Sequence, residues 1–281
     1  MRKIVTLLAI AVLGLTTAAA QQLRVGKATM LSGTSEGGCY HAVFSPAGDY
    51  LLTSAENYDG LLKHDLKSGM KTRLSQARGA GYGVRISRDG KQITANRFEY
   101  RGNLRYTAID RIQVRSGKTT VLRAPQREQV SPDAETAQLY VTTNGYEMTV
   151  HNGASETVIR PNGEESYFWC SVSPDGKHIM YVTAHHGAQV CDINGNNPVF
   201  MGIMNAPQWI DSERVIAMRD EDNGDQVVKS SLVVRSISNP REVQTLVTGQ
   251  KISMYPAVSA DGRRIAFNNE KGQIFLMEVE Q

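Results

Sequence analysis

The hydrophobic residues of this chain fall in many short segments rather than in a few long ones. Apolar segments such as residues 42–44 precede turns rich in Gly, Pro and Asp, and segments such as residues 179–182 and 265–267 follow them. Short apolar runs bounded by turn residues are typical of β-strands. After residue 20 no segment keeps the 3.6-residue period of an amphipathic helix, so the pattern predicts an all-β protein with almost no helix.

A turn of the type Ser-Pro-Asp-Gly returns along the chain. Its copies begin at Ser45, Ser87, Ser131, Ser173 and Ser259, and a degenerate copy covers residues 210–215. Pro fixes φ, Asp accepts hydrogen bonds from backbone amides ahead of it, and Gly accepts a positive φ, so each copy is expected to join two strands. The copies recur about every 43 residues, which is the period of a propeller blade with four strands.

Two further strands are expected in each repeat. The third strands are predicted at residues 106–114, 188–193, 231–237 and 273–279, and the fourth at 71–74, 118–122 and 242–247. The last repeat stops after its third strand, whereas residues 23–32 have the pattern of a fourth strand. We therefore predict a six-bladed β-propeller of four-stranded antiparallel blades, in which the N-terminal strand joins the C-terminal blade and removes the exposed edges.

The first twenty residues have the pattern of an export signal. Arg2 and Lys3 precede the apolar residues 4–15, and small residues at Ala18 and Ala20 suit cleavage after residue 20. The apolar run is short for a membrane-spanning helix, and no other run reaches that length. The protein is expected to be periplasmic or secreted, with residues 1–20 as signal peptide and residues 21–281 as a single propeller domain.

Charge and cysteine content restrict the partners. The chain has 31 Lys and Arg against 28 Asp and Glu, with no basic block after the leader, which argues against nucleic acid as a partner. Cys39, Cys170 and Cys191 are too few for a disulfide framework and are expected to be free. No cofactor is expected, and the protein is expected to be a monomer.

At the turns the sequence resembles the WD-like repeats of a known family. Residues 173–181 and 259–267 are similar to the repeats of the TolB propeller and of the propeller domains of prolyl-oligopeptidase-type and dipeptidyl-peptidase-type proteins. The resemblance implies a propeller fold. TolB also has an N-terminal α/β domain, and the peptidases have a hydrolase domain after the propeller. Here about one strand precedes the first turn and nothing follows the last blade, so a propeller alone is expected.

Three short motifs fit known sites only in part. Residues 33–37 (GTSEG) match a nucleophile elbow but run from strand to strand, without the helix that this motif needs. Residues 220–225 (DEDNGD) resemble a calcium loop with the wrong spacing, so an acidic hairpin loop is expected, with a weak cation site left open. His185 and His186 are adjacent in an expected hairpin and would point to opposite faces, which disfavours a shared metal. Neither a catalytic set nor a metal site is predicted.

Aromatic residues gather where one mouth of the ring is expected. The connections from fourth to first strands and from second to third strands share the face opposite the Ser-Pro-Asp-Gly turns. Rings with a polar edge around a concave mouth suit a sugar, a peptide or a partner loop. The residues expected to bind a ligand there are Tyr40, His41, Tyr58, Asp59, Tyr82, Tyr100, Trp169, His185, Trp209 and Tyr255.

Three functions are open at this point. The first is a binding module for a peptide, glycan or envelope-protein partner. The second is a small propeller enzyme, such as a lyase or lactonase, with His41, His185, Asp59 and Asp220 at the mouth and a possible metal requirement. The third is an envelope scaffold related to the Tol system. The sequence alone does not name the ligand.

Overall fold

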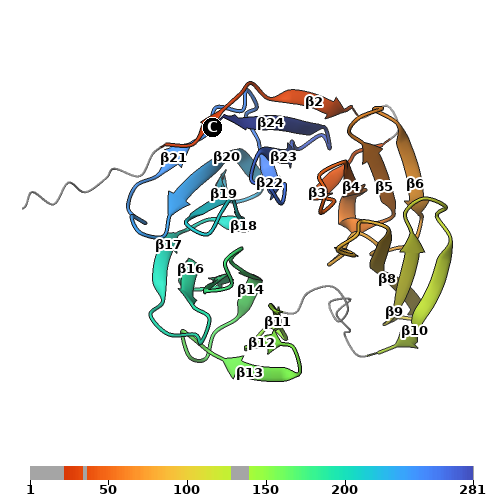
Figure 1. The fold of residues 1–281 in the computed structure, drawn as a ribbon, viewed down its shortest axis with the longest axis horizontal. Helices are drawn as coiled ribbons and strands as arrows, with labels where there is room; N and C mark the ends of the chain where they lie inside the picture. The colour runs from red at the N-terminus through yellow and green to blue at the C-terminus, as the bar shows by residue number, and fades with distance from the viewer. Residues whose placement is uncertain (1–21, 34–36, 128–138, 281) are drawn as a thin grey trace, which may run out of the picture.

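The strands form six antiparallel sheets that stand side by side around one axis (Figure 1). This computed structural model describes residues 22–33, 37–127 and 139–280. The only helical segment in those ranges is the 3-10 turn η1 (Glu56–Tyr58). The prediction of an all-β, six-bladed propeller with antiparallel blades is confirmed.

The first half of the chain forms blades one to three. Blade one contains β3 (Tyr40–Phe44), β4 (Tyr50–Ser54), β5 (Leu61–Asp65) and β6 (Lys71–Ser75). Blade two contains β7 (Arg85–Ile86), β8 (Gln92–Arg101), β9 (Leu104–Gln113) and β10 (Thr119–Gln126). The described strands of blade three are β11 (Leu139–Thr143), β12 (Met148–Asn152) and β13 (Ser155–Ile159). The expected turn at Ser131 lies outside the described residues.

The second half forms blades four to six. Blade four contains β14 (Tyr167–Val172), β15 (His178–Thr183), β16 (Gly187–Asp192) and β17 (Val199–Gly202). Blade five contains β18 (Asn205–Trp209), β19 (Arg214–Asp222), β20 (Val227–Ser236) and the short β21 (Gln244–Thr245). Blade six contains β22 (Met254–Val258), β23 (Arg264–Asn268), β24 (Ile274–Glu280) and the N-terminal strands β1 (Arg24–Val25) and β2 (Thr29–Ser32).

The repeated turns join first to second strands, as predicted. In blade four the Ser173 hydroxyl donates to Asp175 Oδ1 at 2.7 Å and accepts the His178 N–H at 2.9 Å. The Gly176 N–H donates to the Ser173 carbonyl at 2.9 Å, and Gly176 has a φ of 75°. The turns at Ser45, Ser87 and Ser259 repeat the bond from the serine hydroxyl to an aspartate and the bond from the incoming strand.

The N-terminal segment closes the ring. Strands β1 and β2 both pair antiparallel with β24, with Arg24 opposite Glu280 and Thr29 opposite Leu276. The predicted completion of the last blade by the first strand is confirmed, and Figure 1 shows β2 along the outer side of β24.

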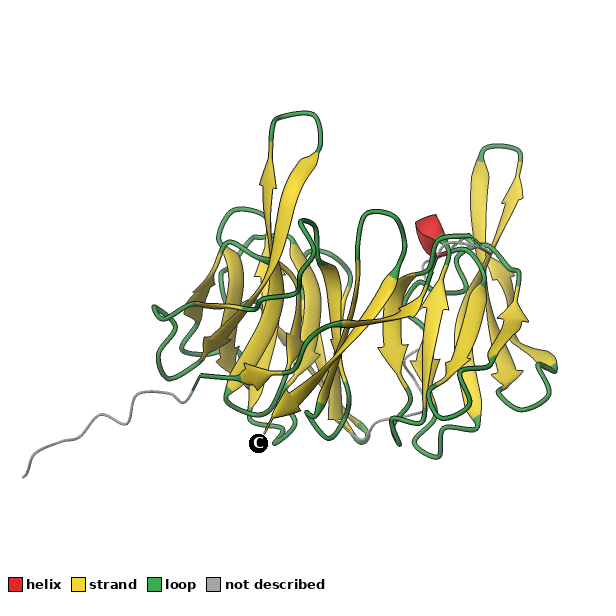
Figure 2. Ribbon diagram, turned by 90° about the horizontal axis from the view of Figure 1, so that it is seen from above, coloured by secondary structure: helices red, strands yellow, loops and turns green. Residues whose placement is uncertain are grey.

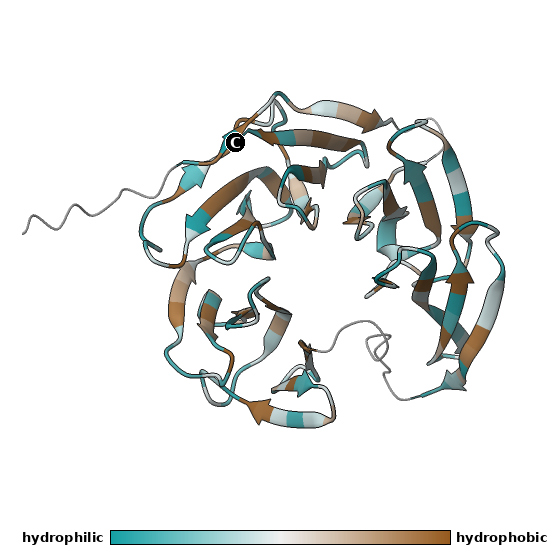
Figure 3. Cartoon of the chain, in the orientation of Figure 1, coloured by the Kyte–Doolittle hydropathy of each residue, from teal (hydrophilic) through white to brown (hydrophobic). Residues whose placement is uncertain are grey.

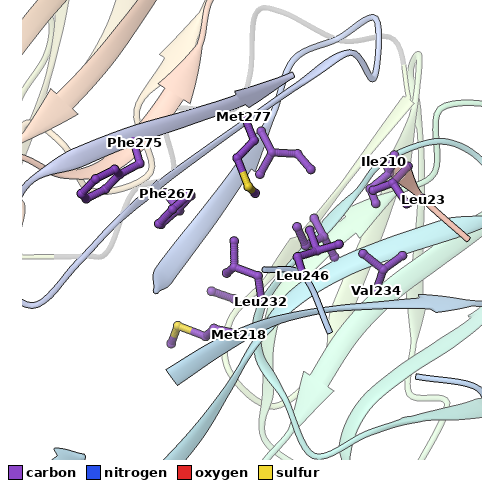
Figure 4. Packing of buried hydrophobic residues seen from close by; sticks show 12 residues of the cluster. Leu23, Ile210, Met218, Leu232, Val234, Leu246, Phe267, Phe275 and Met277 are labelled. Atoms are coloured by element: carbon purple, nitrogen blue, oxygen red, sulfur yellow. The ribbon is translucent and has the colours of Figure 1, made fainter. Parts of the chain in front are cut away.

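The hydrophobic core lies between neighbouring blades. Figure 3 shows hydrophobic residues concentrated on the strands, with hydrophilic residues in the loops between them. The largest cluster joins blades five and six, where Phe267 and Met277 approach Leu232 and Val234, and the N-terminal Leu23 packs into it (Figure 4). Cys39 and Cys191 are buried free thiols in two other clusters.

The two faces of the ring differ. We call the face with the Ser-Pro-Asp-Gly turns the turn face, and the opposite one the mouth face. In Figure 2 the turn η1, in red, lies on the same side as the tips of the two longest hairpins, β8–β9 and β19–β20. The turn η1 and the tips of these two hairpins each connect the second strand of a blade to its third strand. These connections therefore lie together on the mouth face, as expected.

Candidate functional site

The innermost strands share a bulge next to the mouth face. The pairing register shifts between Tyr40 and Val43 in β3, and at the matching place in β14, β18 and β22. In the five inner strands that the structure describes, the residue three positions before the last one has a positive φ: His41 (53°), Gly83 (60°), Trp169 (47°), Ala206 (46°) and Tyr255 (51°). Four of these five residues are not glycine. The left-handed region costs about 1–2 kcal/mol for such residues, so the surrounding fold must hold them there.

The second strands supply part of that support. The His41 N–H donates to Oδ1 of the buried Asn268 in blade six, at 3.3 Å. The Tyr255 N–H donates in the same way to the Met218 sulfur in blade five, at 3.4 Å. The bulges at His41 and Tyr255 are therefore bonded to a side chain of the preceding blade, which fixes these two aromatic residues relative to two blades at once.

Five aromatic side chains from three blades form one contiguous row, which we call the aromatic arc. The His41 imidazole stacks on Tyr58 with centroids 3.8 Å apart and planes 16° apart, and its other neighbour is the edge of Tyr255 at 4.3 Å. Tyr58 meets Tyr82 edge to face at 5.3 Å, and Tyr82 reaches Phe98 at 6.2 Å. The row thus runs from blade six across blade one to blade two.

Local backbone structure positions the middle of the arc. Tyr58 ends η1 and has a φ of 62° itself, which turns its side chain out of the strand direction. The Gly81 N–H donates to the Tyr58 carbonyl at 2.9 Å, and a Cβ at Gly81 would lie 2.4 Å from Ser54 Cβ. Only glycine allows that approach, which brings the neighbouring Tyr82 to the ring of Tyr58.

Burial shifts the pKa values of three polar groups of the arc in the direction that favours the uncharged form. Desolvation lowers the pKa of His41 to about 4, so the imidazole is neutral. Burial also raises the pKa of Tyr58 and of Tyr255, and the carboxylate of Asp220 adds to the effect on Tyr255. That carboxylate is held by Asn205 Nδ2 at 2.9 Å and by the Ser230 hydroxyl at 2.6 Å.

A cavity of about 290 Å³ opens beside the arc in blade one. Its polar lining comes from Tyr40, Glu56, Asp59 and Arg73. Tyr40 also lies 6.3 Å from the His41 ring, so cavity and arc are adjacent. Another cavity, of about 260 Å³, lies on the turn face beside the N-terminal strand, and its lining includes Arg24, Asp211, Arg214 and Asp261.

The structure brings part of the expected site together. Tyr40, His41, Tyr58, Tyr82 and Tyr255 meet in or beside the arc, and Tyr100 stands on the β8–β9 hairpin with 53% of its surface exposed. Asp59 accepts the Gly79 N–H at 3.0 Å and so fixes the loop that leads to Tyr82. Phe98 was not expected from the sequence.

Other expected residues lie apart. Trp169 is exposed at the bulge of blade four and makes no ring contact among the described residues. His185 pairs with Glu165, with Nδ1 and Oε2 3.0 Å apart. Trp209 was placed wrongly: it is the last residue of β18, next to the turn face, and its indole N–H donates to the Ser171 carbonyl at 3.4 Å. It fills space between blades four and five instead of lining the mouth.

Two of the three partial motifs lie wholly within the described residues. A hairpin loop between β19 and β20 is present as expected, but it covers residues 223–226, and residues 220–222 of the DEDNGD motif belong to β19. Glu165 contacts both His185 and His186, at 3.0 and 3.4 Å, so the expectation that the two imidazoles point to opposite faces is wrong, because residues 184–186 form a turn and not an extended strand. Of the GTSEG motif, residues 34–36 lie outside the described residues. Within the described ranges, no three His, Cys, Asp or Glu side chains are close enough together to hold a metal ion, and no helix there is both long and apolar enough to span a membrane.

Comparison with known proteins shows likeness in structure only. No protein-family profile and no curated protein matches the sequence. An oligogalacturonate lyase from Vibrio parahaemolyticus superposes with a TM-score of 0.50 at 10% identity, covering 89% of this chain and 80% of that one. An oligogalacturonate lyase in complex with manganese gives 0.52 at 12%, covering 90% and 80%. A chain of the mitotic checkpoint complex gives 0.54 at 12%, covering 99% and 100%. At these identities the likeness shows the fold alone.

Proposed function

We propose that the protein is a binding module that holds an extended ligand against the aromatic arc. The observation that supports this is the contact of five rings from three blades at the mouth face, where loops have little core to fill. Tyr82, between Tyr58 and Phe98 in the row, keeps 44% of its surface exposed. Exposed rings with polar edges bind sugars and peptides through large contact area at low entropic cost.

We also propose that the protein works outside the cytoplasm. The charged and apolar pattern of residues 1–20 supports export to the periplasm or medium. The ligand is then a peptide, a glycan or a protein of the cell envelope. The resemblance of residues 173–181 and 259–267 to the TolB repeats supports the same compartment.

The arc can be tested with one substitution and a matched control. Tyr82→Ala interrupts the row between Tyr58 and Phe98, and a central aromatic residue of an interface contributes about 2 kcal/mol or more, so binding should weaken at least about thirtyfold. Tyr146→Ala is the control, because Tyr146 is 75% exposed in the β11–β12 connection of blade three and has no ring contact within the described chain.

The measurement uses labelled protein on peptide and glycan arrays and on envelope extracts. The wild type and Tyr146→Ala should retain the same ligands, and Tyr82→Ala should lose them. Equal retention by all three proteins would show that the arc is not the binding site.

A second candidate is a small propeller enzyme. One observation in its favour is the neutral imidazole of His41 at the mouth, because a general base must be unprotonated. The other is the fold that the chain shares with two oligogalacturonate lyases. A pKa of about 4 makes His41 a weak base, which is why binding is the better-supported function. Turnover of polygalacturonate, with and without added manganese, would establish the enzyme if His41→Asn abolished it.

A further inference from the structure

The blade-two end of the arc carries two exposed guanidinium groups stacked on aromatic rings. Arg105 Cζ lies 4.7 Å from the Phe98 centroid, and Arg78 Cζ lies 5.9 Å from the Tyr100 centroid. Tyr100 is directly opposite Arg105 in the β8–β9 pair, and Phe98 and Tyr100 are two residues apart, so all three side chains share one face of the hairpin.

Arg78 is tied to this face from a different connection. The Phe98 N–H donates to the Arg78 carbonyl at 2.9 Å. The ring of Phe98 lies against Gly79 so closely that a Cβ there would be 2.3 Å from it. Phe98 and Tyr100 are separated by about 7 Å of extended strand. The two guanidinium groups therefore stand over neighbouring rings.

Neither Arg78 nor Arg105 is in an ion pair with any described residue. The arginines of the other hairpin face are different: Arg97 pairs with Asp110 at 2.8 Å and with Glu99, and Arg101 pairs with Glu99 at 3.8 Å. A guanidinium stacked on a ring uses its flat face and leaves its N–H edges available. Such an edge binds a carboxylate through two parallel hydrogen bonds.

The other end of the arc is acidic. Burial is the main cause of the raised pKa of Tyr255 and Tyr40, and the carboxylates of Asp220 (at Tyr255) and of Glu56 and Glu270 (at Tyr40) raise it in addition. The site thus carries positive charge at Phe98 and Tyr100 and negative charge at Tyr255 and Tyr40.

On the basis of the proposed binding function, we propose that the ligand is the C-terminal segment of a peptide, with its terminal carboxylate at Arg78 and Arg105. Its chain runs over Tyr82 and Tyr58 toward the acidic end, where a peptide ammonium or a lysine is complementary. A polyuronate or a nucleic acid would place further anions beside Asp220, Glu56 and Glu270. The centroids of successive rings are 6.2, 5.3, 3.8 and 4.3 Å apart. The row is therefore at most roughly 20 Å long, which is the length of about six extended residues.

The test compares two pools of random hexapeptides that differ only in the C-terminus, one free acid and one amide. The wild type should retain the acid pool about tenfold better, as expected for a charge-assisted pair of hydrogen bonds. Arg78→Gln and Arg105→Gln should each reduce this preference without weakening amide binding, and Arg78→Lys should restore part of it. Arg101→Gln is the matched control, since Arg101 stacks on Tyr106 on the opposite face of the same hairpin.

The outcomes separate this inference from the function on which it rests. If both pools bind equally and Tyr82→Ala weakens both, the arc binds peptides but the carboxylate site is wrong. If trigalacturonate or single-stranded DNA is retained in preference to both pools and Arg78→Gln reduces that retention, the ligand class is wrong. If the wild type retains no pool and no array ligand, the inference and the proposed function both fail.

Discussion

His41 shows how a single residue links the backbone of this protein to its candidate site. It has a φ of 53°, its N–H is bonded to Asn268 in the neighbouring blade, and its ring lies between Tyr58 and Tyr255. The imidazole is thus held in an apolar stack where water does not stabilise its charged form. Its low pKa follows from that position.

This low pKa predicts a pH-dependent loss of stability. The pKa of His41 is about 4 in the folded protein and 6.5 in the absence of burial, so between these values the unfolded chain binds more protons. Stability should therefore fall as pH falls through this window, by about 1–3 kcal/mol at its lower end. His41→Asn should lose this component, because asparagine tolerates a positive φ and does not titrate.

Urea unfolding at neutral pH and at several values down to pH 4 measures this effect. The quantity of interest is the difference between wild type and variant, in which the other titrating groups cancel. Parallel pH profiles for the two proteins would refute the assignment.

At the residue scale the sequence predicted only part of the site. Tyr40, Tyr82 and Tyr255 could be placed because each stands a few residues before a recognisable turn, and Tyr58 because it lies in the connection between two expected strands. Phe98, Arg78 and Arg105 could not, because their contact depends on how far the β8–β9 hairpin extends beyond the blade, which the repeat does not encode. Trp209 was misplaced because it was assigned to the start of the inner strand, whereas it directly precedes the degenerate turn at residues 210–215 and is the last residue of β18.

At the scale of the element, the hairpin turn is held by hydrogen bonds of its own side chains and backbone. The Ser173 hydroxyl is buried and both accepts and donates, so it satisfies the first N–H of the next strand and holds Asp175 in place. The pKa of Asp175 is lowered, with this hydroxyl as the main cause. The hydrogen bonds of such turns join residues that are close together in the sequence. The fold could therefore be predicted without any knowledge of long-range contacts.

Ser173→Ala should lower the free energy of unfolding by about 1–2 kcal/mol, since it removes two hydrogen bonds and leaves the His178 N–H without its partner. Ser116→Ala is a suitable control: its hydroxyl is exposed and accepts only a long bond of 3.3 Å from the Lys118 N–H. That change should cost less than about 0.5 kcal/mol. Chemical denaturation of both variants compares them directly, and equal losses would mean that the turn serine has no special role.

At the scale of the whole molecule, the ring depends on contacts between blades that are distant in sequence. Leu23 precedes the closing strand and is 4% exposed, within the cluster shared by blades five and six. It adds a side-chain anchor to the strand pairing of β1 and β2 with β24 (Figure 4). Strand pairing and side-chain packing thus close the ring at the same point.

Leu23→Ala should therefore destabilise the entire propeller by about 2–4 kcal/mol, the usual cost of emptying a buried leucine site. Met30→Ala, in the same N-terminal segment but exposed, should have little effect. Thermal unfolding followed by circular dichroism measures both. A loss confined to local fraying, with an unchanged global transition, would show that closure does not hold the ring together.

The closing strand also has a consequence for biosynthesis. Thr29 and its partner Leu276 are 247 residues apart, so β2 is synthesised long before the strand with which it pairs. Until that strand is made, β2 has no edge to pair with. A premature stop codon that removed β24 would leave β1 and β2 without the strand with which they pair. Before β24 is made, the unpaired strand edges favour aggregation, which chaperones counteract.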